Sequence, residues 1–364
     1  MYTVCIMLEK IESTLAQLVA FDSRSAHRED CHDIITFVQN ELAPLGLHIQ
    51  TDFERANPWL FATTKPGNSP KILLAAHLDT VPASNTQQLT LRREGDKLYG
   101  RGVLDMKFAA ACFIELLKDL GDDLPQHDIG VLFSTDEEIG GASVLEMLQK
   151  DVLRPELVIL PDSSAGWQIE QRAKGLSFTE VIARGTNGHG SRPWESDNAF
   201  HKLLPALQDI RDAYPSIKRD GPTVSITIVE SGKPLAMSQV PNKATATLDM
   251  RAFEPNELVA YKEFLQTLAT TYGLSLTTLA EDEALILDKQ HPRVQSFLKV
   301  YEQEIGAVTY NDAYGGTDGR HFAKFGIPCV INGIGGGGFH QADEWASRSD
   351  ILQFYKLLKT FVLS

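Results

Sequence analysis

The fold is decided by a stretch that reads Ala75-Ala76-His77-Leu78-Asp79-Thr80-Val81-Pro82. An apolar run that begins at Ile72 leads into it, and a short run of this kind predicts a buried strand. Residues two apart on an extended chain point to the same side, so His77 and Asp79 would lie together at the strand end. An imidazole beside a carboxylate suits a metal ligand that a second residue holds in place. Alone, the pair could equally be a core histidine and an unrelated turn aspartate.

Length, composition and charge narrow the class of protein. The chain has 364 residues, which is enough for two domains. Its residues are 43% hydrophobic and 23% charged, as is typical of a soluble globular protein. The formal net charge of -14 argues against a nucleic-acid partner and against attachment to an anionic membrane.

Cysteine usage and the start of the chain predict the compartment. The cysteines lack metal-binding spacing, which predicts free thiols in a reducing environment. They are Cys5, Cys31, Cys112 and Cys329. The briefly apolar start has no basic region before it and is not typical of a signal peptide, and no segment is long enough to span a membrane. We expect a cytoplasmic protein.

Buried strands and amphipathic helices alternate in the first half of the chain and return at its end. Apolar spacing predicts helices over 8–20, 27–45, 108–120, 291–305, 319–325 and 349–363. Strands are expected at 47–53, 59–63, 72–77, 129–133, 157–160 and 328–331, with a hairpin formed by 89–93 and 97–99. This pattern predicts an α/β domain with a mostly parallel sheet flanked by helices.

The pattern changes at about Lys174. From there the segments read strand, helix, strand, strand, helix, strand, at 176–184, 196–214, 223–230, 243–252, 255–272 and 274–279. That order is typical of a ferredoxin-like α+β domain. We therefore predict a discontinuous domain of residues 1–173 and 286–364, and an inserted domain of residues 174–285.

Polar residues stand at the ends of several predicted strands and before one helix. The candidates are His77, Asp105, Glu137, Glu138, Asp162 and His340. In a mostly parallel sheet such positions converge on one edge, where ligands bind. Histidines with several carboxylates suit one or two zinc-like ions, with water completing the coordination. The set predicts a metallohydrolase and leaves its substrate open.

Simpler explanations exist for some of these residues. Asp105 precedes a helix, where a carboxylate is commonly a plain N-terminal cap. Glu137 and Glu138 are adjacent and would raise each other's pKa unless a cation lay between them, which favours function over a solvated turn. The run Gly335–Gly338 lacks the lysine and the hydroxyl residue of a phosphate-binding loop, so we interpret it as a flexible loop that delivers His340.

Taken in order, these motifs resemble the di-zinc family of co-catalytic peptidases and deacylases. Its members include acetylornithine deacetylase, succinyl-diaminopimelate desuccinylase, aminoacylase, glutamate carboxypeptidase, carboxypeptidase G-like enzymes and tripeptidase. The resemblance extends over nearly the whole chain. It rests on 77–82, 100–107, 136–138, Asp162, 188–193 and His340.

The resemblance implies a role for each candidate. Five residues would hold two zinc ions, for which cobalt or manganese could substitute: His77 and Asp162 on one ion, Glu138 and His340 on the other, and Asp105 bridging both. Asp79 would orient His77. Glu137 would be the general base that takes a proton from water and passes it to the leaving nitrogen.

The inserted domain resembles the family's lid and dimerisation domain. His189 would reach the site of a partner subunit and stabilise the oxyanion, although by itself it could be a surface histidine. Asn242 and Arg251 would contact the substrate, and an arginine fork suits a carboxylate. The alternative for Arg251 is a structural salt bridge. Gly316 and Thr317 lie in a glycine-rich loop that would line the carboxylate pocket.

Signals for the substrate conflict. Deacylases of the family generally have glutamate where this chain has Asp162, whereas its peptidases have aspartate. The segment from His340 to Glu344 resembles the end motif of acetylornithine deacetylase. We expect a homodimeric enzyme that hydrolyses the amide bond of a small carboxylate-bearing amino-acid derivative, of the acetylornithine deacetylase or succinyl-diaminopimelate desuccinylase type. A carboxypeptidase or dipeptidase is one alternative, and a catalytically silent binding protein on this scaffold is another.

Overall fold

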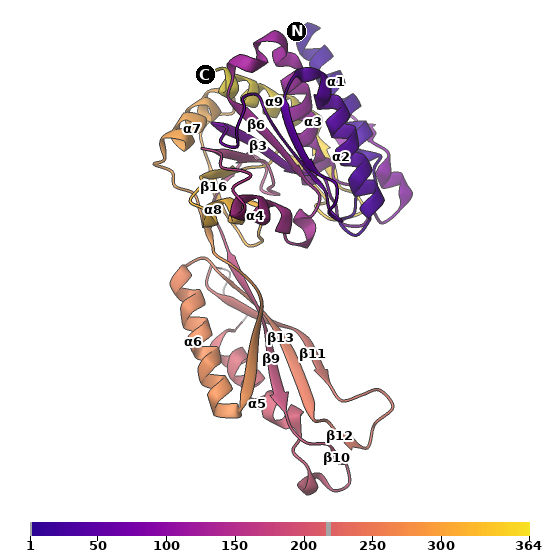
Figure 1. Ribbon diagram of the computed structural model, residues 1–364, viewed down its shortest axis with the longest axis vertical. Coiled ribbons are helices and arrows are strands. Elements are labelled where there is room, and N and C mark those ends of the chain that lie inside the picture. The colour runs from indigo at the N-terminus through magenta and orange to yellow at the C-terminus, as the bar shows by residue number, and fades with distance from the viewer. Residues whose placement is uncertain (1, 216–219) are drawn as a thin grey trace. The chain divides into compact units, whose positions relative to one another are not determined.

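The computed structural model describes the backbone of residues 2–215 and 220–364, and the side chains of these residues from Ile6 onward. The chain forms two compact units, which Figure 1 shows. The first contains the residues up to Gln171, Ile286–Asp312 and Thr317–Ser364. The second contains Arg172–Leu285 and Ala313–Gly316. The insertion thus begins two residues before the predicted residue 174, and a second short segment joins it.

A six-stranded sheet forms the centre of the first unit, in the order β1-β2-β6-β3-β7-β17. Its strands are β1 (His48–Asp52), β2 (Trp59–Thr63), β3 (Ile72–His77), β6 (Ile129–Ser134), β7 (Val158–Leu160) and β17 (Cys329–Ile331). The four strands β6, β3, β7 and β17 run parallel, whereas β1 and β2 add an antiparallel edge. Every residue of β6 is buried, as expected of an apolar strand in a sheet covered on both faces.

Seven helices of the described chain belong to the first unit. They are α1 (Tyr2–Val19), α2 (Arg28–Leu42), α3 (Phe108–Leu120), α4 (Ala142–Gln149), α7 (Pro292–Glu304), α8 (Gly319–Lys324) and α9 (Arg348–Leu363). The alanine- and leucine-rich α3 is almost wholly buried because α1, α9 and β3 all pack against it. Helix α4 was not predicted: it is short, and it follows Gly140 and Gly141, which both have positive φ.

A small antiparallel sheet pairs a segment near the C-terminus with the predicted hairpin. Its order is β18-β19-β5-β4, with β18 (Gly336–Gly337), β19 (Trp345–Ser347), β5 (Lys97–Tyr99) and β4 (Arg92–Glu94). The predicted hairpin is therefore present, but its first strand starts at Arg92 because Thr86–Leu89 form a helical turn. The interpretation of the glycine run as a flexible loop was wrong in part, since Gly336 and Gly337 pair with β19.

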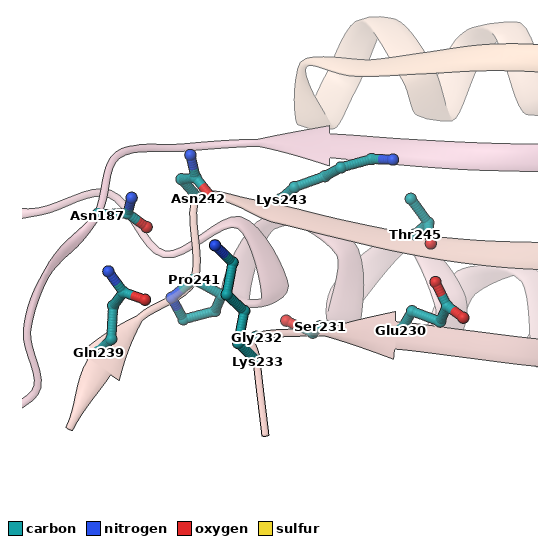
Figure 2. A pocket seen from close by; sticks show the side chains of 10 residues that line it. All are labelled: Asn187, Glu230, Ser231, Gly232, Lys233, Gln239, Pro241, Asn242, Lys243 and Thr245. Carbon is teal, nitrogen blue, oxygen red and sulfur yellow. The ribbon is translucent and has the colours of Figure 1, made fainter. Parts of the chain in front are cut away.

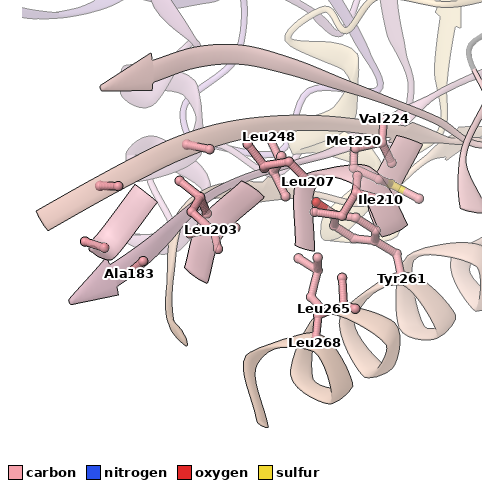
Figure 3. Packing of buried hydrophobic residues seen from close by; sticks show 14 of the residues in the cluster. Ala183, Leu203, Leu207, Ile210, Val224, Leu248, Met250, Tyr261, Leu265 and Leu268 are labelled. Carbon is pink, nitrogen blue, oxygen red and sulfur yellow. The ribbon is translucent and has the colours of Figure 1, made fainter. Parts of the chain in front are cut away.

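The second unit has the ferredoxin-like order. It consists of β9 (Gly175–Arg184), α5 (Ala199–Ala213), β11 (Thr223–Ser231), β13 (Lys243–Ala252), α6 (Pro255–Tyr272) and β14 (Leu274–Asp282). The sheet order is β11-β13-β9-β14, and all neighbours are antiparallel. Helices α5 and α6 pack on this sheet through apolar residues that include Leu207, Leu248 and Tyr261 (Figure 3).

Short strands complete both parts of the chain. Strands β10 (Gly188–His189) and β12 (Gln239–Val240) pair with each other. Strands β15 (Leu285–Ile286), β8 (Ile169–Ala173) and β16 (Tyr310–Ala313) form a further small sheet. The backbone N–H of Leu287 donates to the carbonyl of Gln171 over 2.9 Å, so the chain re-enters the first unit beside the point where it left.

The structure also bears on the predicted free thiols and on the expectation that no segment spans a membrane. Cys31, Cys112 and Cys329 are free, as predicted, and the structure shows that they are buried; the side chain of Cys5 lies outside the described residues. Among the helices in the described ranges, none is long and apolar enough to cross a membrane.

Candidate metal centre

The five predicted metal ligands come together in the first unit. His77 ends β3, and Asp105 lies in the irregular turn Val103–Lys107 before α3. Glu138 follows β6, Asp162 follows β7, and His340 lies in the loop between β18 and β19. Their ligand atoms form two groups, each within 4.8 Å: His77 with Asp105 and Asp162, and Asp105 with Glu138 and His340.

Asp105 is common to the two groups and lies between the histidines. Its Oδ1 is 3.0 Å from Nε2 of His77, and its Oδ2 is 2.7 Å from Nε2 of His340. Asp162 Oδ1 is 3.9 Å from the same nitrogen of His77. Glu138 Oε2 is 3.6 Å from that of His340. Each histidine therefore points one nitrogen at the shared aspartate and at one further carboxylate.

The charges of this cluster fit bound cations. Burial, and then the charge of Asp105, raise the pKa of Glu138 to about 7. Burial likewise raises the pKa of Asp162 well above its usual range. Carboxylates packed in this way can all be ionised if cations lie between them. Imidazole and carboxylate donors are also the set that zinc and related ions prefer. The residues therefore fit a metal centre.

Asp79 supports the centre through contacts with His77, Glu137 and Glu138. Its backbone carbonyl lies 3.0 Å from Nδ1 of His77. Because a carbonyl can only accept, Nδ1 carries the hydrogen, which leaves the Nε2 lone pair to face the cluster. The Asp79 carboxylate accepts from the backbone N–H of Glu137 (3.2 Å) and of Glu138 (3.1 Å). It also accepts from the hydroxyl of Ser25 over 2.6 Å. Asp79 thus fixes the imidazole through its backbone carbonyl and the turn that carries the glutamates through its carboxylate.

Glu137 lies beside the ligands and outside both ligand groups. It opens the helical turn Glu137–Ile139 after β6. Burial, and then the charge of Asp162, raise its pKa well above the usual range. The far side of the turn is held by α8, because Arg320 donates to the carbonyl of Gly140 over 2.8 Å. Nε2 of His321 is 3.1 Å from the same carbonyl oxygen.

Several residues that support the centre were missed from the sequence. Arg320 and His321 hold the turn of Glu137, and Arg101 and Glu344 form a buried ion pair beside Asp105. Glu344 and Arg101 carried a signal, since Glu344 ends the motif that begins at His340 and Arg101 lies in the motif of residues 100–107. The others contact residues far away in the chain, which local spacing does not reveal.

The predicted substrate residues belong mainly to the second unit. His189 is exposed, and its Nδ1 lies 2.7 Å from the hydroxyl of Ser191. Asn242 lines an open pocket of about 330 Å³, where Asn187 and Gln239 also lie (Figure 2). Gly316 belongs to the second unit and Thr317 to the first.

Arg251 does not share a location with Asn242. Its guanidinium pairs with Asp249 over 2.7 Å, which matches the alternative of a structural salt bridge. Asn242 precedes β13, whereas Arg251 is near the end of that strand. At ~3.3 Å per residue, the strand separates them by about 30 Å. His189 lies at the Asn242 end, since β10 pairs with β12.

A mostly parallel sheet whose strand ends present histidines and carboxylates around a shared aspartate defines a metal-dependent hydrolase. Residues 73–364 match the family model described as peptidase family M20/M25/M40. The chain belongs to this family, so the predicted resemblance, the α/β fold and the hydrolysis of a carbon–nitrogen amide bond are confirmed.

Relatives and solved structures agree with this membership. A Mycobacterium tuberculosis protein with a provisional assignment as succinyl-diaminopimelate desuccinylase is 32% identical over 315 residues, covering 83% of this chain and 85% of that protein. A succinyl-diaminopimelate desuccinylase from Corynebacterium glutamicum is 29% identical over 323 residues, with 85% of each chain covered. A Staphylococcus aureus tripeptidase structure has a TM-score of 0.80 at 19% identity, covers 98% of this chain and 99% of its own, and shows a shared fold.

Proposed function

We propose that this enzyme is an N-acyl-amino-acid deacylase, with N-succinyl-diaminopimelate as the first substrate to test. The observation that carries this proposal is the name of the relatives, which align with more than four-fifths of this chain. Such a substrate is a small amino-acid derivative with free carboxylates and one amide bond to cleave. The enzyme would then act in amino-acid biosynthesis.

We infer that the centre holds two cations, with zinc as the first candidate. The support is the division of the ligands into two groups that share Asp105. Bound cations would lower the pKa of a coordinated water and polarise the amide carbonyl. Glu137 would accept the proton of the attacking water and donate it to the leaving nitrogen. The Asp79 carboxylate would keep Glu137 in place by accepting a hydrogen bond from the backbone N–H of Glu137.

A peptidase is the second candidate function. Asp162 favours it, because the peptidases that this chain resembles have aspartate at that ligand. The fold shared with a tripeptidase is compatible with it. A silent binding protein is the least favoured reading, since all five ligand positions carry a metal-binding side chain.

A substrate panel tests the choice between these functions. Zinc-loaded enzyme would be offered N-succinyl-diaminopimelate, N-acetylornithine and a set of dipeptides, with detection of the freed amine. We expect kcat/KM for one N-acyl substrate to exceed that for every dipeptide by about 100-fold or more, because a pocket that binds the acyl group leaves polar groups unpaired when another substrate enters. A preference for dipeptides would favour the peptidase. Zinc binding without any hydrolysis would favour the binding protein.

We further propose a homodimer formed through the second unit. A small substrate cannot span the ~30 Å of strand between Asn242 and Arg251, so the two residues would serve different sites. The edge strand β11 exposes Ile228 (53%) and Val229 (49%), and an exposed apolar edge is a natural pairing surface.

A charge on that edge is expected to separate the subunits. Ile228→Lys should change the sedimenting species from dimer to monomer, because a lysine opposes edge-to-edge pairing. Val259→Lys is the matched control, since Val259 is equally exposed (55%) on α6 and should leave the dimer intact. A wild-type monomer, or a dimer that survives Ile228→Lys, would contradict the proposal.

Composition and the state of the thiols support a proposal for the compartment and for the excluded partners. We propose a cytoplasmic location, which the free buried thiols of Cys31, Cys112 and Cys329 support. The net charge of -14 disfavours nucleic acids and anionic membranes as partners.

A further inference from the structure

Arg101 and Glu344 form a buried ion pair next to the proposed cation site. Nη1 of Arg101 is 2.6 Å from Oε2 of Glu344, and their side chains are 2% and 0% exposed. The partners are 243 residues apart in the chain. Arg101 lies in the turn before α3, and Glu344 lies at the end of the loop between β18 and β19. Each partner also bonds to backbone that carries a metal ligand.

Glu344 holds the backbone of the Asp105 turn. Its Oε2 accepts from the N–H of Gly102 over 3.1 Å. Its Oε1 accepts from the N–H groups of Leu104 (2.9 Å) and Asp105 (3.3 Å). Hydrogen bonds to an ionised carboxylate are stronger than those between neutral groups. Three of them on four consecutive residues fix the direction in which the Asp105 side chain leaves the backbone.

Arg101 holds the backbone of the His340 loop. Its Nη2 donates to the carbonyls of His340 (3.4 Å) and Gln341 (3.1 Å), and to that of Pro82 (3.4 Å). His340 has φ 62, a left-handed conformation that is unfavourable for a residue with a Cβ atom. The two bonds around His340 help to keep its backbone in this conformation and its imidazole near Asp105.

The other cation group has independent support. His77 is part of strand β3 and is held by Asp79, as described above. Asp162 lies two residues beyond the end of β7, and its N–H donates to the carbonyl of Leu160. Neither residue bonds to the ion pair through a hydrogen bond found in the described residues. The pair therefore acts on two members of one group, Asp105 and His340, and on only the shared member of the other.

We propose that Arg101 and Glu344 are positioning residues for the proposed cation centre. They fix the geometry of the Asp105–Glu138–His340 site more strongly than that of the His77–Asp105–Asp162 site. This inference rests on the proposed two-cation centre. A buried ion pair often adds no more stability than well-packed apolar residues would, so stability alone does not account for this one. Its contribution lies in the geometry of two ligands that come from distant parts of the chain.

The test compares zinc affinities of folded variants. Glu344→Gln removes one charge and leaves Arg101 buried without its partner. The double variant Arg101→Met, Glu344→Gln removes both charges and so avoids an unpaired buried cation. Glu115→Gln is the matched control. Glu115 is a buried glutamate that pairs with a basic side chain, Lys118, as Glu344 does with Arg101. Among the described residues, it accepts from Thr14 and bonds to no backbone near a proposed metal ligand. Zn²⁺ binding would be measured by competition with a chromophoric chelator, and folding by circular dichroism and thermal unfolding.

The expected result is asymmetric. Wild type and Glu115→Gln should bind two Zn²⁺ per chain with the same affinities. The double variant should keep one affinity near the wild-type value and lose about 10- to 100-fold in the other, as is usual when a residue that supports a ligand is removed. Unchanged affinities in the folded double variant would overturn the inference, as would equal weakening of both sites. A wild-type chain that binds no Zn²⁺ would instead overturn the proposed two-cation centre, and this inference with it.

Discussion

Replacing Glu137 with glutamine is expected to lower kcat by about 10²- to 10⁴-fold while both cations stay bound. Glutamine has nearly the same shape but cannot accept a proton. Glu137 belongs to neither ligand group, so metal binding does not need its charge. Its backbone N–H would still donate to Asp79, which keeps the turn in place. The change should therefore remove proton transfer and little else.

The measurements are kcat, KM and metal content of the purified variant. Glu138→Gln is a sharp control, since it alters the adjacent residue, which belongs to a ligand group. That variant should lose one cation together with its activity. If Glu137→Gln kept most of its turnover, the general base would be another group. If it lost a cation, Glu137 would be a ligand.

Replacing Asp105 with asparagine is expected to remove both cations and to lower kcat/KM by about 10³-fold or more. Asp105 is the only residue that the two groups share. A neutral amide neither bridges two cations nor offsets their repulsion. A metal ion contributes several kcal/mol of transition-state stabilisation, and about 4 kcal/mol corresponds to the expected loss of rate.

Metal analysis after dialysis separates this prediction from a general loss of structure. Asp162→Asn should lose one cation only, because Asp162 belongs to one group. Asp96→Asn should keep both, since Asp96 accepts hydrogen bonds from Ser347 and Ser349 and is no ligand. Two cations retained by Asp105→Asn would show that Asp105 does not bridge them.

The strands that carry the centre could be predicted because their signals are local. The apolar run that ends at His77 predicts β3 with its observed bounds, and the run before Ser134 predicts β6 except for its last residue. Polar residues that follow buried parallel strands meet at one edge of the sheet, so most of the candidate metal ligands could be predicted from the sequence. The helix–strand order of the second unit was also visible from its periodicity.

The remaining features depend on contacts between distant residues. Strand β18 consists of two glycines and has no periodicity, so its pairing with β19 could not be expected. The ion pair of Arg101 and Glu344 is invisible to any local window. Asn242 and Arg251 were both assigned to the substrate, although β13 extends between them. Their residue types predicted which groups they could bind, but only the observed strand shows how far apart they lie.

Because the first unit is discontinuous in sequence, its candidate metal centre is completed during protein synthesis only after the main segment of the second unit. The ribosome releases His77, Asp105, Glu138 and Asp162 first, then the whole of the second unit's main segment, and His340 only after that segment. Domains fold as units while the chain emerges, so the second unit can complete its sheet while the first still lacks β17, β19 and α9. A nascent chain therefore holds one ligand group without its histidine. Chain connectivity sets the moment at which the centre is complete, and that moment comes only after the main segment of the second unit has been made.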